Sequence, residues 1–157
     1  MGTARKKPRT RSRYGVDITK KGKEKRTFQG VVFDSEMELK ALRDYFLPLK
    51  EQGEIKEIER QKEFILQPAY TKNGKRILPI KYVADYVVTW KDGTVEVIEI
   101  KGGMVDPIAV MKRKMFDYIY PDLTLRWMSV SVIDGGLVDF EIVKRGRKER
   151  KKAKSKE

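Results

Sequence analysis

Three charged residues stand in a stretch that otherwise reads as two neighbouring β-strands. Asp85 lies in the segment YVADYVVTW, and Glu99 and Lys101 lie in the segment TVEVIEIKGG. A charge within a strand costs free energy unless the side chain faces water or has a partner. Two carboxylates on one face can hold a divalent cation, and a lysine beside them partly compensates their charge. The alternative interpretation is an ordinary solvated strand face.

The turn WKDGT between the two segments sets their register. A three-residue loop ending at Gly93 in the left-handed conformation predicts that Asp85 lies opposite Glu99, with Cβ atoms about 5 Å apart. Lys101 shares their face by strand alternation. A two-residue loop would instead place Asp85 opposite Ile100, a carboxylate on an apolar face, so we favour the first register. Opposed carboxylates repel, and a bound cation or a retained proton relieves the repulsion. Three valines are expected on the same face: Val83, Val87 and Val97.

Composition limits the chemistry that such a site can use. The 157 residues include no histidine and no cysteine. This excludes HNH nucleases, Ser-His-Asp hydrolases, and metal sites built from imidazole or thiolate. Carboxylate oxygens suit Mg²⁺, with Mn²⁺ as a substitute.

The elements that must position these residues belong to one domain. Ser35 is a candidate N-cap for a helix at 36–50, with Glu38 as its capping-box partner. Pro107 opens a second helix that runs to about Tyr120. The fold class is α/β, a mixed central β-sheet flanked by helices in the order αβββαβ. The expected strands and turns are one or two strands within 53–70, a turn at 73–75, a hairpin of 80–90 and 94–101, and strands at 123–132 and 137–143.

The positive charge is concentrated at the two ends of the chain. The net charge is +13, of which residues 1–30 carry +9 and residues 141–157 carry +6, leaving −2 for the segment between them. We therefore expect a flexible basic arm at 1–28, a domain at 29–143, and a flexible basic tail at 144–157. Nucleic acid is the favoured partner, and a solubility tail or a membrane-surface patch is the alternative. The candidate phosphate-binding residues are Lys6, Lys7, Arg9, Arg11, Arg13, Arg147, Lys148, Arg150, Lys151 and Lys152.

The composition also bears on location. No run of about 18 apolar residues is present, so we expect no membrane span. The basic N-terminal segment lacks the apolar core of a secretory signal. These features favour the cytoplasm.

The central motifs resemble the PD-(D/E)XK nuclease superfamily. Its pattern is an acidic residue in one strand, followed by Glu/Asp-x-Lys in the next, which here is Asp85 and then Glu99-Ile100-Lys101, followed by Gly102-Gly103. Glu38 matches a glutamate that many members carry on the preceding helix. The residues FDSxxE, YxADxxV and ExKG are also similar to a small group of phage-encoded endonuclease-like proteins. Ala84 stands where the family usually has proline.

The resemblance implies roles for these residues. Asp85, Glu99 and the carbonyl of Ile100 would bind Mg²⁺, with Glu38 joining directly or through water. Lys101 would orient the attacking water or stabilise the transition state. Two further residues have alternative explanations: Gln61 is a candidate contact to the bound water or a phosphate, or a polar strand end, and Lys114 is a candidate phosphate contact or part of a solvated helix face. Glu38 itself is equally explained as a helix cap.

The resulting expectation is a Mg²⁺-dependent DNA endonuclease in phage DNA processing, acting in the host cell cytoplasm. A small basic nuclease with no evident reader domain favours selectivity for branched DNA or Holliday junctions over a sequence. The alternatives are a non-catalytic nucleic-acid-binding protein on a degenerate nuclease fold, and an RNA- or ribosome-binding protein. A homodimer, which would place two sites on opposed strands, stays open.

Overall fold

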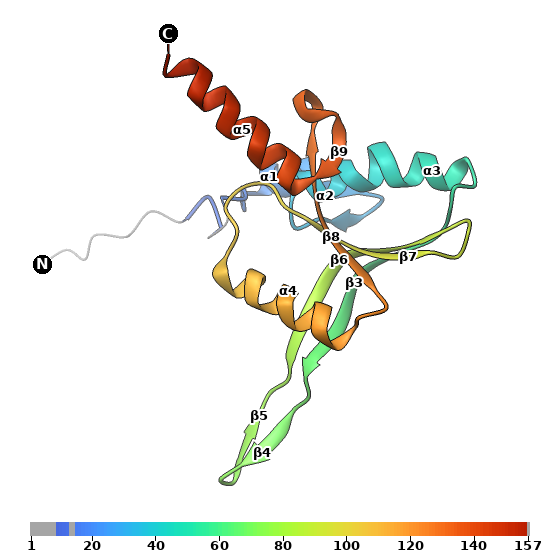
Figure 1. The fold of residues 1–157 in the computed structure, drawn as a ribbon, viewed down its shortest axis with the longest axis vertical. Helices are drawn as coiled ribbons and strands as arrows, with labels where there is room; N and C mark the ends of the chain where they lie inside the picture. The colour runs from blue at the N-terminus through green and yellow to red at the C-terminus, as the bar shows by residue number, and fades with distance from the viewer. Residues whose placement is uncertain (1–8, 13–14, 157) are drawn as a thin grey trace, which may run out of the picture.

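A five-stranded mixed sheet forms the centre of the protein (Figure 1). The computed structural model describes residues 9–12 and 15–156. β7 and β8 pair in parallel, and the other neighbours pair antiparallel. The mixed α/β architecture expected from the sequence is therefore confirmed. In spatial order the strands are β3 (Ile55–Gln67), β6 (Ile80–Trp90), β7 (Val95–Ile100), β8 (Thr124–Ser131) and β9 (Gly136–Asp139).

A continuous helical stretch covers one face of the sheet and carries Glu38. It consists of α2 (Glu36–Lys40), the π-helical segment η1 (Ala41–Phe46) and α3 (Leu47–Glu51). The helix continues past Pro48. The chain loosens to π geometry just before Pro48, which accommodates a residue that has no N–H to donate.

The opposite face is covered by α4 (Pro107–Ile119), as the sequence predicts, with the Asp106 side chain accepting from the N–H of Ile108. Two apolar cores result. The α2 core, between the sheet and α2–α3, contains Phe46, Tyr86, Val88, Ile98 and Met128, among others. The α4 core contains Phe64, Ala84, Val97, Phe116 and Trp127, among others.

The paired strands β3 and β6 change faces at Gln61. In β3, Ile58 packs in the α2 core and Phe64 in the α4 core, although residues an even number apart normally share a face. Gln61 has φ +51°, the left-handed region, and this single residue rotates the ribbon. In β6 the change comes at Asp85, directly across from Gln61. The expectation that Val83 lies on the same side as Val87 is therefore wrong: Val83 is 42% exposed.

Beyond the sheet, β3 and β6 run into a projecting two-stranded arm (Figure 1). It is formed by β4 (Tyr70–Lys72) and β5 (Lys75–Ile77). Asn73 and Gly74 both have positive φ, which a two-residue hairpin turn of this type requires, so the turn predicted at 73–75 is confirmed. Residues 68–78 are all exposed.

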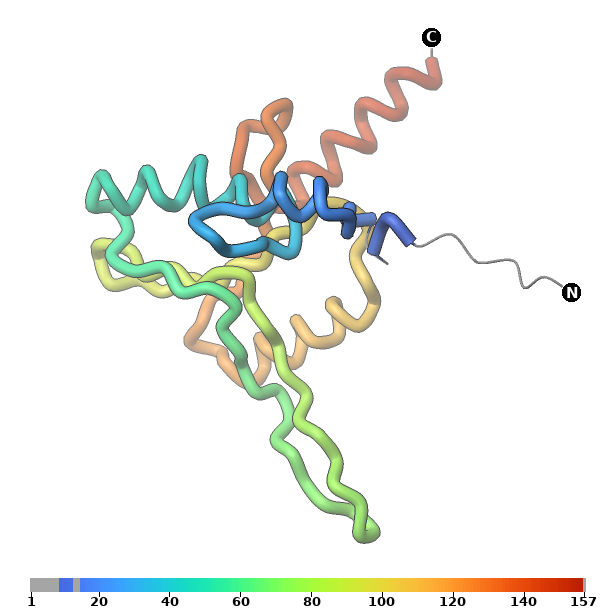
Figure 2. Tube along the Cα trace, turned by 180° about the vertical axis from the view of Figure 1, so that it is seen from behind, coloured from blue at the N-terminus to red at the C-terminus, as the bar shows by residue number. Residues whose placement is uncertain are grey.

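The N-terminal segment is ordered over more of its length than the sequence suggests. It contains α1 (Lys20–Lys25), β1 (Thr27–Phe28) and β2 (Val31–Val32). Arg26 is buried and donates to the carbonyl oxygens of Phe33 and Asp17. From behind, this segment crosses beside α2, at the end of the molecule away from the arm (Figure 2). The domain boundary expected at residue 29 thus falls inside a structured segment.

The C-terminal segment differs from the expected tail. β9 stops at Asp139, and α5 (Phe140–Lys154) occupies the residues expected to be a strand to 143 and a tail from 144. Phe140 and Val143 are buried, which anchors the first turns of the helix. Among the described residues, no helix has the length and apolar character needed to cross a membrane.

Candidate active site

The strands that carry Asp85 and Glu99 pair in the register that the turn predicts. Trp90 N–H donates to the Thr94 oxygen, and the ladder continues to the pair Tyr86 and Ile98. Gly93 has φ +90°, so the three-residue loop is confirmed. Beyond that last pair the backbone ladder ends, and Asp85 Oδ2 accepts from Ile100 N–H at 2.7 Å instead. The carboxylate therefore replaces a backbone acceptor where the ribbon turns.

Lys101 lies against Glu99 and an aromatic ring. Its Nζ is 2.8 Å from Glu99 Oε1 and 5.0 Å from the ring centroid of Trp127. Glu99 and Lys101 are each less than one-fifth exposed at their side chains. The other oxygen of Glu99, Oε2, is buried without a hydrogen-bond partner. A buried carboxylate oxygen with no donor is costly, and a cation can satisfy it.

Glu38 caps its helix and also has a buried carboxylate oxygen that the cap does not use. Ser35 Oγ accepts from the backbone N–H of Glu38 at 3.1 Å and donates to its Oε1 at 2.9 Å, so the helix cap is confirmed. Yet Glu38 is only 6% exposed, and its Oε2 is buried without a partner. Tyr86 OH donates to the Glu38 carbonyl oxygen at 2.9 Å, which fixes this turn of α2 on the sheet. Capping explains one carboxylate oxygen and leaves the other available.

Burial raises the pKa of all three carboxylates, and neighbouring carboxylates add to the rise for Asp85 and Glu38. Burial, followed by the charges of Glu99 and Glu38, raises the pKa of Asp85 from 3.8 to about 8. Burial also raises the pKa of Glu38 from 4.5 to about 7, with Asp34 and Glu99 adding to the effect and the Ser35 hydrogen bond opposing it. Burial raises the pKa of Glu99, and Lys101 opposes the rise. The effects of Glu99 on Asp85 and Glu38, and of Glu38 on Asp85, indicate that the three carboxylates lie close enough to interact electrostatically.

These residues fit a Mg²⁺ or Mn²⁺ ion held by few direct ligands. Among the described residues, no group of three or more acidic side chains is arranged to hold one metal ion. Mg²⁺ commonly takes only one or two carboxylates and retains several waters. Asp85 and Glu99 supply such a pair, the Ile100 carbonyl is a third oxygen, and Glu38 remains for an outer, water-mediated contact. The buried, unpartnered Oε2 atoms of Glu99 and Glu38 are the observation in favour of this fit.

Gln61 is also part of the cluster. Its Nε2 donates to Asp85 Oδ1 at 3.3 Å, while its backbone holds the left-handed conformation. Non-glycine residues in this conformation cost free energy and occur often at functional sites. The amide orients the aspartate, which is a contact different from the water or phosphate contact expected from the sequence.

Three cations beside the site were not predicted as site residues. Arg60 lies 3.8 Å over the Phe33 ring, and its charge opposes the rise in the pKa of Glu38. Lys112 opposes the rise in the pKa of Glu99, and Arg113 stacks on Trp127 at 4.7 Å. Lys114 is exposed on the same helix. The signal for Arg60 was its place next to Gln61, in a polar run inside a strand.

The candidate phosphate-binding residues near the chain ends occupy different settings. Lys6, Lys7 and Arg13 lie outside the described residues, and Arg9 and Arg11 are exposed. On α5, Arg147 donates to the Gly102 carbonyl at 2.8 Å, and Arg150 pairs with Asp134 at 2.7 Å. The Arg147 contact brings the first half of the basic helix beside the glycines that follow Lys101. Lys148, Lys151 and Lys152 lie along the same helix, and all three are exposed.

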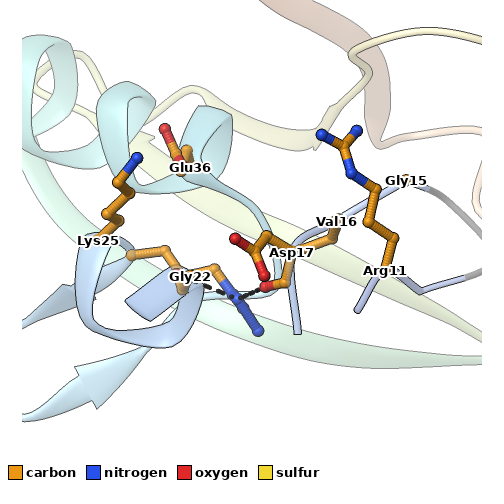
Figure 3. A pocket seen from close by; sticks show the side chains of 8 residues that line it. Arg11, Gly15, Val16, Asp17, Gly22, Lys25 and Glu36 are labelled. Carbon is orange, nitrogen blue, oxygen red and sulfur yellow. Dashed lines mark hydrogen bonds between the residues drawn. The ribbon is translucent and has the colours of Figure 1, made fainter. Parts of the chain in front are cut away.

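A hollow of about 330 Å³ lies away from the carboxylates, at the N-terminal segment (Figure 3). Arg11, Asp17 and Lys25 line it together with Glu36 of α2. Arg26 at its base is held by backbone carbonyls, so its role there is structural. The carboxylate cluster, rather than this hollow, carries the buried unpartnered oxygens and is the stronger candidate for chemistry.

A comparison with known families shows which family the chain belongs to. A family model described as "Protein of unknown function (DUF1064)" matches residues 18–133, and the chain belongs to this family. The matched range includes Glu38, Gln61, Asp85, Glu99 and Lys101, and ends before α5. No curated protein and no solved structure shows a significant match to the chain.

Proposed function

We propose that the protein is a Mg²⁺-dependent DNA endonuclease of the PD-(D/E)XK type. A single observation carries the proposal. Two buried carboxylate oxygens near Asp85, Glu38 Oε2 and Glu99 Oε2, have no hydrogen-bond partner. Three carboxylates that repel one another lower the stability of the fold, and a bound divalent cation would compensate that repulsion.

The residues support a division of roles. Asp85 and Glu99 bind the cation, and Gln61 together with the Ile100 N–H holds Asp85 in position. When bound, Mg²⁺ lowers the pKa of a coordinated water and stabilises negative charge on a phosphate. If Glu99 held the cation, Lys101 would be free to contact the attacking water or the phosphate. Hydrolysis then leaves a 5′-phosphate and a 3′-hydroxyl.

The basic surfaces support a polyanionic substrate. Arg147 of α5 contacts Gly102, directly after Lys101, so a phosphate backbone bound at this end of the helix would lie near the carboxylates. The competing function is a nucleic-acid-binding protein without catalysis. It accounts for the cations equally well, but it leaves the carboxylate cluster unexplained.

Cleavage of plasmid DNA with Mg²⁺, and its absence with EDTA, tests the proposal. Asp85→Asn, Glu99→Gln and Lys101→Met should each lower cleavage by about two orders of magnitude or more while DNA affinity stays within a few-fold. Asp117→Asn, on the exposed side of α4, is the matched control. Metal-dependent cleavage that survives Asp85→Asn and Glu99→Gln would overturn the assignment. Linear, nicked, flap and four-way-junction substrates then define the selectivity.

A further inference from the structure

The β4–β5 arm, which no other part of the described chain covers, presents an unusual set of charges. Residues 68–78 are exposed and include Lys72, Lys75 and Arg76 but no acidic residue. The ion pairs of the described residues include none of these three cations. By contrast, Lys81 at the base of the arm pairs with Glu63 at 2.6 Å.

Two of the cations face each other. Lys72 pairs with Lys75 across the arm, directly beside the turn. Like charges directly opposite one another destabilise a β-ribbon, and this short ribbon has no core beneath it to compensate. A polyanion bound at the tip removes this repulsion.

The shape of the arm narrows the choice of polyanion. A two-stranded β-ribbon fits the major groove of B-form DNA, which is about 12 Å wide. The major groove of an A-form RNA duplex is deep and narrow and does not admit such an element. Tyr70 and Ile77 pair on the same face as the two lysines and are partly exposed, so this face offers apolar as well as charged contacts.

The length of chain between the arm and Asp85 limits how far the tip lies from the carboxylates. Asp85 lies ten positions after Lys75, a separation of at most about 33 Å along an extended chain. One turn of B-DNA is about 34 Å long. We propose that the β4–β5 arm inserts its tip into the major groove of duplex DNA within about one helical turn of the scissile phosphate. The inference rests on the proposed nuclease function for the position of the cut, but not for the binding itself.

The test measures DNA binding without metal, by fluorescence anisotropy over a salt series. The variant replaces Lys72, Lys75 and Arg76 by alanine. A second variant replaces them by glutamine and retains side-chain length, and thermal unfolding confirms that both are folded. The control replaces three exposed lysines on and near α2–α3, Lys40, Lys50 and Lys56, and removes the same charge.

The arm variants should lower the slope of log affinity against log salt by about 0.9 for each phosphate that they no longer neutralise, up to about 2.7. The control should leave the slope unchanged. The wild-type protein should bind a duplex of about 30 base pairs more tightly than one of about 12, and most of that difference should disappear in the arm variants. The reduction should be smaller on duplex RNA of equal length. Equal slopes for the arm variants and the control, or equal reductions on DNA and RNA, would overturn the inference.

The outcomes separate this inference from the proposed function. If the arm variants bind DNA more weakly but the wild-type protein never cleaves DNA, the role of the arm in binding is supported and the nuclease function is refuted. If the arm variants bind as tightly as the wild type and the wild type cleaves DNA with Mg²⁺, the nuclease function is supported and the role of the arm is refuted.

Discussion

Replacing Asp85 by asparagine should stabilise the metal-free protein, because the carboxylate is held at a free-energy cost. The pKa of Asp85 is raised from 3.8 to about 8. At about 1.4 kcal/mol for each tenfold change, this corresponds to about 5 to 6 kcal/mol for full ionisation. The cost is shared with Glu99 and Glu38, and the buried amide also loses hydration. We therefore expect a gain of about 1 to 3 kcal/mol at about pH 9.

The gain should depend on pH with a definite sign. Because folding raises the pKa of Asp85, its proton contributes stability below about pH 4, and that contribution is lost as the pH rises through about 8. The wild-type protein should therefore lose stability between about pH 5 and pH 9. The Asp85→Asn variant should lose less, so its advantage should be largest at high pH and small at about pH 5.

Denaturant unfolding at the two pH values, with EDTA or with Mg²⁺, measures the effect. Mg²⁺ should stabilise the wild-type protein at high pH and leave the variant nearly unchanged, because the cation binds the ionised carboxylates. Asp117→Asn should change neither the free energy of unfolding nor its response to Mg²⁺. The reasoning from carboxylate repulsion would be refuted if Asp85→Asn were no more stable than wild type at about pH 9, or if it gained the same stability at about pH 5 and pH 9.

Three further changes test other parts of the site. Gln61→Gly should raise the free energy of unfolding by about 0.5 to 1 kcal/mol, because glycine accepts the left-handed conformation. It should also slow cleavage, because it removes the hydrogen bond to Asp85. Equal stability of Gln61→Gly and Gln61→Ala would argue against strain at this position. Ser35→Ala should cost about 1 kcal/mol in denaturant unfolding. The cleavage rate should rise with pH as the carboxylates ionise, and in Ser35→Ala this rise should occur at a higher pH, since the Ser35 hydrogen bond lowers the pKa of Glu38. An unchanged pH–rate profile would show that Glu38 takes no part in the chemistry. Deleting residues 151–157 should leave the thermal midpoint unchanged and flatten the salt dependence of DNA binding, and an unchanged salt slope would show that these cations do not contact phosphate.

The local order of elements could be predicted because the signals are short-range. The Ser35 cap, the Asp106-Pro107 start of α4 and the three-residue loop ending at Gly93 depend on residues within one turn of each other. The register of the hairpin followed from that loop, and it placed Asp85 and Glu99 together.

The parts that could not be predicted depend on contacts between distant residues. α5 looked too polar to fold, but Phe140 and Val143 anchor it, and Arg150 reaches Asp134. The face change at Gln61 has no local signature, because glutamine is not a residue that favours a positive φ. Arg60 joins the site only because of that rotation, so strand alternation alone could not identify it.

The face change at Gln61 has a consequence for how the protein tolerates substitution. Where the ribbon rotates, Asp85 lies between the two apolar cores, and its carboxylate contacts Gln61 and the Ile100 N–H. Asparagine has nearly the same volume as aspartate, so Asp85→Asn removes the charge without opening a cavity. Loss of the chemistry and loss of the fold are thus separable events at this position. A descendant of this chain that lost the proposed cleavage activity could still be inherited as a stable protein that only binds.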